Sequence, residues 1–155
     1  MINKRSHSIF METTGISVNK TIGEIQSELA QYGATKVIID YLDGSPEGLI
    51  FSLLIEKKEI PYKLPCRWKA IYSYLASKKK RKYNSNQIIE ISKRIAWRQV
   101  YKLVQAQLAF ISTEMSSPEE LFLSFRLCKN KNTIYENIIS NQTKMIEFRE
   151  DKPNE

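Results

Sequence analysis

The sequence predicts an α+β fold: a helix, a three-stranded antiparallel meander, and then a helical C-terminal half built on one long helix. Three observations lead to this fold class. Apolar residues recur at helical spacing near the start of the chain, alternate every second residue over 36–64, and return to helical spacing over 86–115. The chain has 155 residues, of which 42% are hydrophobic, and this is enough for one domain. We expect a flexible arm over 1–20, a single domain over 21–147 and a flexible tail over 148–155.

The first helix is expected over residues 21–32. Thr21 and Glu24 have the spacing of a capping box, in which a hydroxyl and a carboxylate satisfy free amides at the start of a helix. Gly33 follows at the position where a left-handed residue commonly ends a helix. The apolar face of this helix consists of residues three or four positions apart, namely Ile22, Ile25, Leu29 and Tyr32.

Three strands are expected over residues 36–42, 49–55 and 60–64, because apolar and polar side chains alternate in each. The stretch 43–48 between the first two is dense in turn-forming residues. Pro61 has no amide hydrogen to donate, so the third strand should lie at an edge of the sheet. One face of this meander is apolar, and the first helix is its expected cover.

The C-terminal half should be helical. A second helix is expected over 66–77 and a long one over 86–115. A short helix should begin after Ser117, and a last helix should run from a capping box at Thr133 to about residue 147. The long helix has a wide apolar surface, which favours either a core position or an oligomer interface. Its main stripe comprises Trp97, Val100, Tyr101, Val104, Leu108 and Ile111.

Several classes of protein lack their characteristic residues here. The single histidine, His7, lies in the predicted arm, so neither a zinc site nor a catalytic triad is expected. Cys66 and Cys128 are expected to be free thiols in a reducing compartment. The five glycines form no phosphate-binding loop, and the sequence indicates no metal and no cofactor. No apolar run approaches the roughly 18 residues of a membrane span, so we expect a cytoplasmic protein without a membrane partner.

Positive charge is concentrated in one part of the sequence. The chain has 24 Lys and Arg against 17 Asp and Glu, a formal net charge of +7. Residues 63–102 carry 12 of the basic residues and only one acidic residue. This surplus favours a polyanionic partner, and we expect nucleic acid, DNA rather than RNA, or an anionic nucleotide. The residues expected to contact phosphate are Arg67, Lys69, Lys78, Lys79, Lys80, Arg81, Lys82, Arg94, Arg98 and Lys102.

Two other interpretations of these cations stay open. A basic loop often does no more than keep a surface hydrated, and a basic helix face can bind a protein partner. Trp97 and Tyr101 border the basic residues of the long helix and would suit base stacking. Their place on the apolar stripe favours the core instead.

Five stretches of the chain carry a resemblance to other proteins: TTGISVNKTIGEIQSELAQYGATKV (13–37), EIPYKLPCRWKAIY (59–72), RIAWRQVYKLVQAQLAFISTEM (94–115), EELFL (119–123) and TIYENI (133–138). Together they make residues 13–138 similar to a widespread group of small uncharacterised proteins encoded by phages, prophages and related mobile elements. The most specific stretch is the one from Arg94 to Met115. The resemblance implies a bacterial host cell as the setting. It also implies an early or accessory gene product, for which nucleic-acid handling and interference with host defence are common roles.

Three functions follow as hypotheses. The leading one is a non-catalytic phage or mobile-element accessory protein that binds nucleic acid through a basic patch on the second helix, the following loop and the long helix. The alternative is an oligomeric anti-defence or regulatory protein that binds a host protein or sequesters an anionic signalling nucleotide. The third is a metal-dependent nuclease that uses Glu24, Asp40 and Asp43, although the residues after Asp43 favour a solvated turn.

Overall fold

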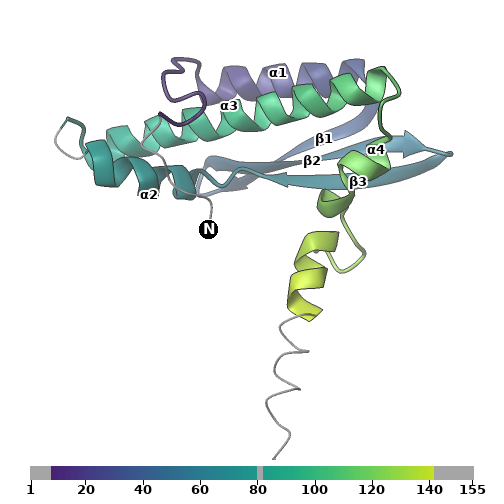
Figure 1. Cartoon of the computed structure of the whole chain (residues 1–155). Helices are drawn as coiled ribbons and strands as arrows, with labels where there is room; N and C mark the ends of the chain where they lie inside the picture. Colours follow the sequence, from purple (N-terminus) through teal and green to yellow (C-terminus); the bar gives the residue numbers. More distant parts are fainter. Residues whose placement is uncertain (1–7, 80–81, 142–155) are drawn as a thin grey trace, which may run out of the picture.

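A computed structural model describes residues 8–79 and 82–141 of the chain. The fold is α+β, with the predicted order of elements. These elements are α1 (Val18–Gln31), β1 (Ala34–Leu42), β2 (Ser45–Ile55), β3 (Lys58–Pro65), α2 (Trp68–Lys79), α3 (Ser85–Ser112), α4 (Pro118–Leu121) and the 3-10 turn η1 (Leu123–Phe125). Figure 1 shows two layers, in which α1 and α3 lie side by side over one face of the sheet and α2 lies beside the N-terminal half of α3.

Helix α1 begins earlier than the sequence predicts. Its N-cap is Ser17, whose Oγ accepts a hydrogen bond from the amide of Lys20 at 3.3 Å. The capping box predicted at Thr21 and Glu24 is therefore wrong: Thr21 lies inside the helix and is fully buried. The two residues have the right spacing for a cap, but they face α3 instead. The end of the helix is as predicted, with Gly33 in the left-handed region at φ +88°.

The described part of the predicted arm, residues 8–20, lies against the helices. Ile9 packs beside a small apolar cluster formed by α2 and α3, and the carbonyl of Phe10 accepts a hydrogen bond from Gln99 Nε2 of α3 at 2.8 Å. Residues 18–20 belong to α1 rather than to the arm. Residues 1–7 and the predicted tail, 148–155, lie outside the described residues.

The sheet is the predicted antiparallel meander, in the order β1-β2-β3. The first turn is shorter than the predicted 43–48, because β2 already begins at Ser45. Asp43 and Gly44 alone make this turn, with φ values of 49° and 73°, as a two-residue hairpin turn with primed geometry requires. Strand β3 lies at an edge, as Pro61 predicts, and the amide of Leu127 donates to the Pro61 carbonyl at 2.9 Å.

The core lies between the sheet and the helix pair. Phe51, Tyr62 and Phe122 form its aromatic centre, with ring centroids 5.1–5.5 Å apart. Four residues of the predicted stripe on α3 are buried against it, and the other two, Val100 and Ile111, are half-buried beside it; the buried four are Trp97, Tyr101, Val104 and Leu108. The stripe therefore belongs mainly to the core, whereas Leu103 and Phe110 of the same helix are 43% and 46% exposed.

The remaining helical elements agree with the sequence apart from small shifts of their ends. Helix α3 starts with a capping box formed by Asn84 and Gln87, which is not among the predicted capping boxes. Thr133 and Glu136 form their predicted capping box ahead of a helical stretch over 134–141, and the predicted end near 147 lies outside the described residues. Within the part of the chain that the structure describes, no helix has the length and apolar character needed to cross a membrane.

Candidate nucleic-acid interface

Trp68, at the start of α2, has two cations beside its ring. The ammonium groups of Lys69 and Lys93 lie 5.8 Å and 5.1 Å from the centroid of its ring. Its Nε1 donates a hydrogen bond to Glu47 Oε1 at 2.8 Å. Cations at these distances are attracted to the negative face of an indole ring. The tryptophan thus holds two cations from different helices close together.

Glu47 reaches Trp68 because of an irregularity in β2. Asp40 pairs with Gly48 and Tyr41 pairs with Pro46, so Glu47 is an extra residue with no partner on β1. Such a bulge turns the side chain of the extra residue to a new direction. The carbonyl of Glu47 accepts a hydrogen bond from the amide of Cys66 at 2.8 Å, which fixes the bulge against the start of α2.

Arg94 lies between two shallow clefts beside this group. The first has a volume of about 430 Å³ and contains Lys93 and Arg94, together with Glu90 and residues 17–19 and 43–46. The second, of about 400 Å³, is lined by Tyr83, Asn84, Asn86, Gln87, Glu90, Ile91 and Arg94. Arg94 and Glu90 belong to both linings, so the two clefts are adjacent along the N-terminal half of α3.

Lys82 extends this surface at the far end of the second cleft. Its ammonium group lies 5.3 Å from the ring centroid of Tyr83, which lines that cleft. Four cations from α2, the loop and α3 are thus placed by Trp68, by Tyr83 or by the two clefts, and we call them the cation run: Lys69, Lys93, Arg94 and Lys82. Lys69, Arg94 and Lys82 are among the residues predicted from the sequence to contact phosphate, whereas Lys93 is not.

Carboxylates moderate the charge of the cation run. Glu90 pairs with Lys93 at 3.7 Å, and Asp43 lines the first cleft. Glu47 accepts the hydrogen bond from Trp68 Nε1. The cation run therefore keeps a positive excess of about one charge over these three carboxylates. A phosphate bound at the cation run would be stabilised by several weak electrostatic contacts rather than by one strong contact.

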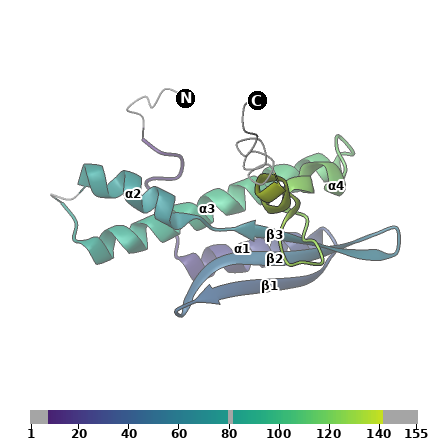
Figure 2. The same ribbon diagram turned by 90° about the horizontal axis from the view of Figure 1, so that it is seen from below.

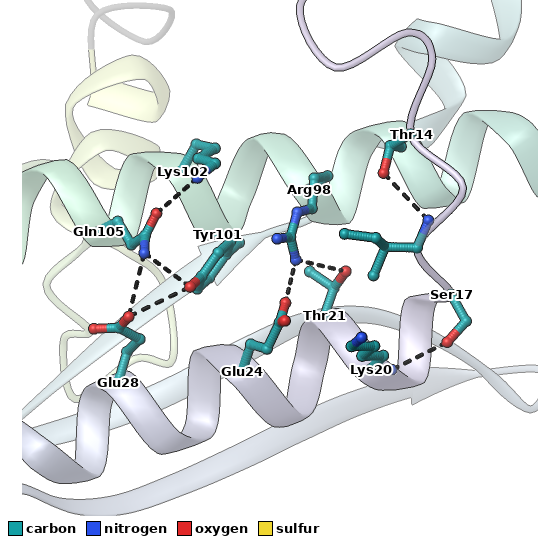
Figure 3. A network of polar contacts seen from close by, with 11 residues as sticks. Thr14, Ser17, Lys20, Thr21, Glu24, Glu28, Arg98, Tyr101, Lys102 and Gln105 are labelled. Atoms are coloured by element: carbon teal, nitrogen blue, oxygen red, sulfur yellow. Dashed lines mark hydrogen bonds and ion pairs between the residues drawn. The ribbon is translucent and has the colours of Figure 1, made fainter.

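Arg98 does not belong to the exposed basic surface that the sequence predicts. It is 8% exposed, forms an ion pair with Glu24, and donates a hydrogen bond to Thr21 Oγ1 at 3.4 Å. Its guanidinium also lies 4.4 Å from the ring centroid of Tyr101. Figure 3 shows Arg98 directed from α3 toward α1, between the two helices. The positive charge of Arg98 is neutralised by Glu24, and the ion pair joins α3 to α1.

Lys102 lies in the same interhelical network, away from the cation run. Its ammonium group donates to Gln105 Oε1 at 3.0 Å, and Gln105 Nε2 donates in turn to Tyr101 and to Glu28 (Figure 3). The hydroxyl of Tyr101 donates to Glu28 at 3.3 Å. Burial, followed by the negative charge of Glu28, raises the pKa of the Tyr101 hydroxyl. This network ties α1 to α3 over two turns.

The other predicted cations are dispersed. Arg67 is exposed and lines two different clefts, of about 500 Å³ and 230 Å³, on the side of Phe125. Lys78 lies near the end of α2, where its ammonium group donates to the hydroxyl of Tyr74 at 2.5 Å. The side chain of Lys79 and the whole of Lys80 and Arg81 lie outside the described residues.

The carboxylates considered for a nuclease belong to three separate environments. Glu24 pairs with Arg98, Asp40 lies 3.8 Å from Lys63 across the sheet, and Asp43 is in the first hairpin turn. Among the described residues, no three His, Cys, Asp or Glu side chains are grouped so as to hold a metal ion. Burial, together with the nearby Glu47, raises the pKa of the Cys66 thiol to about 12, so this thiol is not a nucleophile near neutral pH.

Comparison with known proteins identifies no relative of this chain. No family model, curated protein or solved structure matches the chain. The function must therefore be inferred from what the described surface can bind. Lys93 and Arg94 line the two open clefts, Lys69 and Lys82 lie beside them, and amine and guanidinium groups of this kind suit phosphate groups spaced along a polymer.

Proposed function

We propose that this protein is a non-catalytic, nucleic-acid-binding accessory protein of a phage or mobile element. The observation that carries the proposal is the cation run: Lys93 and Arg94 line the open clefts beside α3, Lys69 lies with Lys93 against Trp68, and Lys82 lies against Tyr83, which lines the second cleft. Cations spread over two helices and the loop between them match an extended polyanion better than they match a compact ligand.

The aromatic residues of this surface support contacts with phosphate rather than with bases. Trp68 and Tyr83 already have lysine ammonium groups near their rings, which compete with base stacking there. Trp97 and Tyr101, the other candidates for base stacking, are buried in the core. Phosphate contacts position a nucleic acid without distinguishing its sequence. We therefore expect binding that depends little on base sequence.

The test is the salt dependence of binding to a short labelled DNA duplex, followed by fluorescence anisotropy. If the four cations of the run contact phosphates, the slope of log K against log[salt] should be about −3 to −4. A steeper slope would show that further cations, such as those of the loop after α2, also contribute. Affinity that is flat between low and physiological salt would reject the proposal. A parallel titration with duplex RNA tests the expected preference for DNA.

Two double variants of equal charge separate the cation run from general electrostatics. Lys93→Ser/Arg94→Ser removes two cations of the run, whereas Lys57→Ser/Lys58→Ser removes two from the hairpin at the end of β2. The first should reduce the slope by about two and weaken all sequences alike, and the second should change it little. Equal effects from both would mean that only net charge matters, and the interface would be rejected.

The first cleft favours a second candidate, an anionic nucleotide. Its volume of about 430 Å³ falls in the range of small-ligand sites, and Lys93 and Arg94 line it. Asp43 and Glu90 line it as well, which disfavours a highly charged ligand. Calorimetry with mono- and dinucleotides distinguishes the candidates: tight, weakly salt-dependent nucleotide binding that excludes the duplex would favour this one.

A further inference from the structure

Strand β1 leaves one edge of the sheet open. The order of the strands is β1-β2-β3, and the outer edge of β3 is bridged by Arg126 and Leu127. Figure 2 shows β1 as the outermost strand, and none of the described elements lies beside its outer edge. Alternate residues of an antiparallel edge strand direct their N–H and C=O groups away from the sheet. The edge of β1 is therefore able to pair with a further strand.

On the outer face of the sheet, β1 has an apolar side chain flanked at equal spacing by a basic and an acidic side chain. Ile38 is 52% exposed, and it has Lys36 two residues before it and Asp40 two residues after it. Residues two apart in a strand lie on the same face. Val37 and Ile39, which alternate with them, pack against the core on the other face.

This arrangement is complementary to itself. If two copies of β1 pair antiparallel with Ile38 opposite Ile38, Lys36 of each copy faces Asp40 of the other. On the inner face, Val37 of each copy then faces Ile39 of the other. Opposite charges directly across an antiparallel pair stabilise it, and so do pairs of β-branched residues. A two-fold axis through Ile38 thus satisfies both faces at once.

The backbone supports the same centre. The pairing of β1 with β2 is regular from Lys36 to Asp40, and it is interrupted on either side, between Ala34 and Lys36 and between Asp40 and Tyr41. The extra residue is Thr35 of β1 on the first side and Glu47 of β2 on the second, and each bulge interrupts the ladder and increases the local twist. Ile38 is the midpoint of the regular segment. The five regular residues are therefore the same five that the charge pattern selects.

We propose that the protein forms a homodimer by antiparallel pairing of two β1 strands about Ile38, which joins two three-stranded sheets into one of six strands. Within each copy, Lys36 already pairs with Glu59 at 2.7 Å and Asp40 lies 3.8 Å from Lys63. The dimer therefore carries rows of alternating charge across its outer face, from Glu59 through Lys36 to Asp40 and Lys63 of the second copy. Charges of one sign would keep two edges apart, whereas this pattern attracts a copy of itself.

Charge reversal tests the register. In Lys36→Asp, carboxylates face each other at both ends of the pairing, and in Asp40→Lys, ammonium groups do. Sedimentation of the full chain over micromolar to submillimolar concentrations should show a dimer for the natural sequence. Each single variant should have a dissociation constant at least about tenfold higher. Lys57→Asp, which makes the same change of charge at the end of a hairpin, should leave dimerisation unchanged.

Recombining the reversals gives the decisive result. The double variant Lys36→Asp/Asp40→Lys should dimerise again, and mixing the two single variants should give a heterodimer. Loss of the contacts with Glu59 and Lys63 within one copy cannot produce this recovery, because those contacts are repulsive in the double variant. Circular dichroism confirms that each variant is folded. A natural chain that stays monomeric, single variants that dimerise normally, or a double variant and a mixture that both stay monomeric would each overturn the proposal.

Discussion

Replacing Arg98 by methionine should destabilise the protein and leave nucleic-acid binding unchanged. The Arg98 side chain is 10% exposed, and its partner Glu24 is 32% exposed. Removing one member of a buried ion pair costs about 3–5 kcal/mol, and the partial exposure of Glu24 reduces this to about 2–3 kcal/mol. For a chain of this length, each 1 kcal/mol corresponds to about 2–4 °C, so Tm should fall by about 4–12 °C.

The assay is urea and thermal unfolding followed by circular dichroism, with DNA anisotropy on the same preparations. A double-mutant cycle with Glu24→Gln isolates the pair, and the double variant should cost less than the two single costs together. Met keeps most of the apolar volume of the Arg side chain, so a cavity does not confuse the result. The reasoning fails if Arg98→Met costs less than about 0.5 kcal/mol. It also fails if this variant loses as much affinity for DNA as Lys93→Ser/Arg94→Ser does.

Three further predictions concern the backbone and the thiols. Lys57 has a φ of 66°, a conformation that glycine adopts without strain, so Lys57→Gly should raise the free energy of unfolding by about 0.5–1 kcal/mol. The urea midpoint should rise while the slope of the unfolding free energy against urea concentration stays unchanged. Gly48→Ala should lower the midpoint, because its Cβ would lie 2.8 Å from the Leu64 carbonyl oxygen, and a neutral effect would contradict that close approach. Near neutral pH, a thiol reagent should modify Cys128 in the native protein but Cys66 only on unfolding, since burial raises the Cys66 pKa to about 12; equal rates would contradict this.

The sequence predicts the elements of this fold well because the patterns that define them are local. Alternation alone locates all three strands, and the apolar stripe of α3 locates the spine of the core. Pro61 identifies the edge strand because a missing amide hydrogen is a property of a single residue. The capping boxes show the limit of this reasoning. The one at Thr133 is confirmed, whereas the one at Thr21 fails because Ser17 caps the helix one turn earlier.

The candidate site was harder to predict because it depends on pairs of distant residues. Helical spacing places Arg98 beside the apolar stripe of α3, but only the folded chain brings Glu24, 74 residues earlier, within reach of it. Lys93 was missed because its aromatic neighbour, Trp68, belongs to another helix. The pairs of Lys69 with Trp68 and of Lys82 with Tyr83, by contrast, are neighbours in the sequence. Pairs of a cation with an aromatic neighbour in the sequence can therefore be predicted from the sequence, whereas pairs between helices cannot.

The two proposed interactions use different parts of the molecule, which makes them independently testable. The cation run lies on α2, the following loop and the N-terminal half of α3, whereas the proposed dimer uses the outer edge of β1 (Figures 1 and 2). Lys36→Asp should therefore leave the salt slope per protomer unchanged on a duplex too short for two copies. Lys93→Ser/Arg94→Ser should likewise leave the dimer intact. If either variant alters both properties, the surfaces are coupled, and each set of binding data must then be measured at a fixed state of assembly.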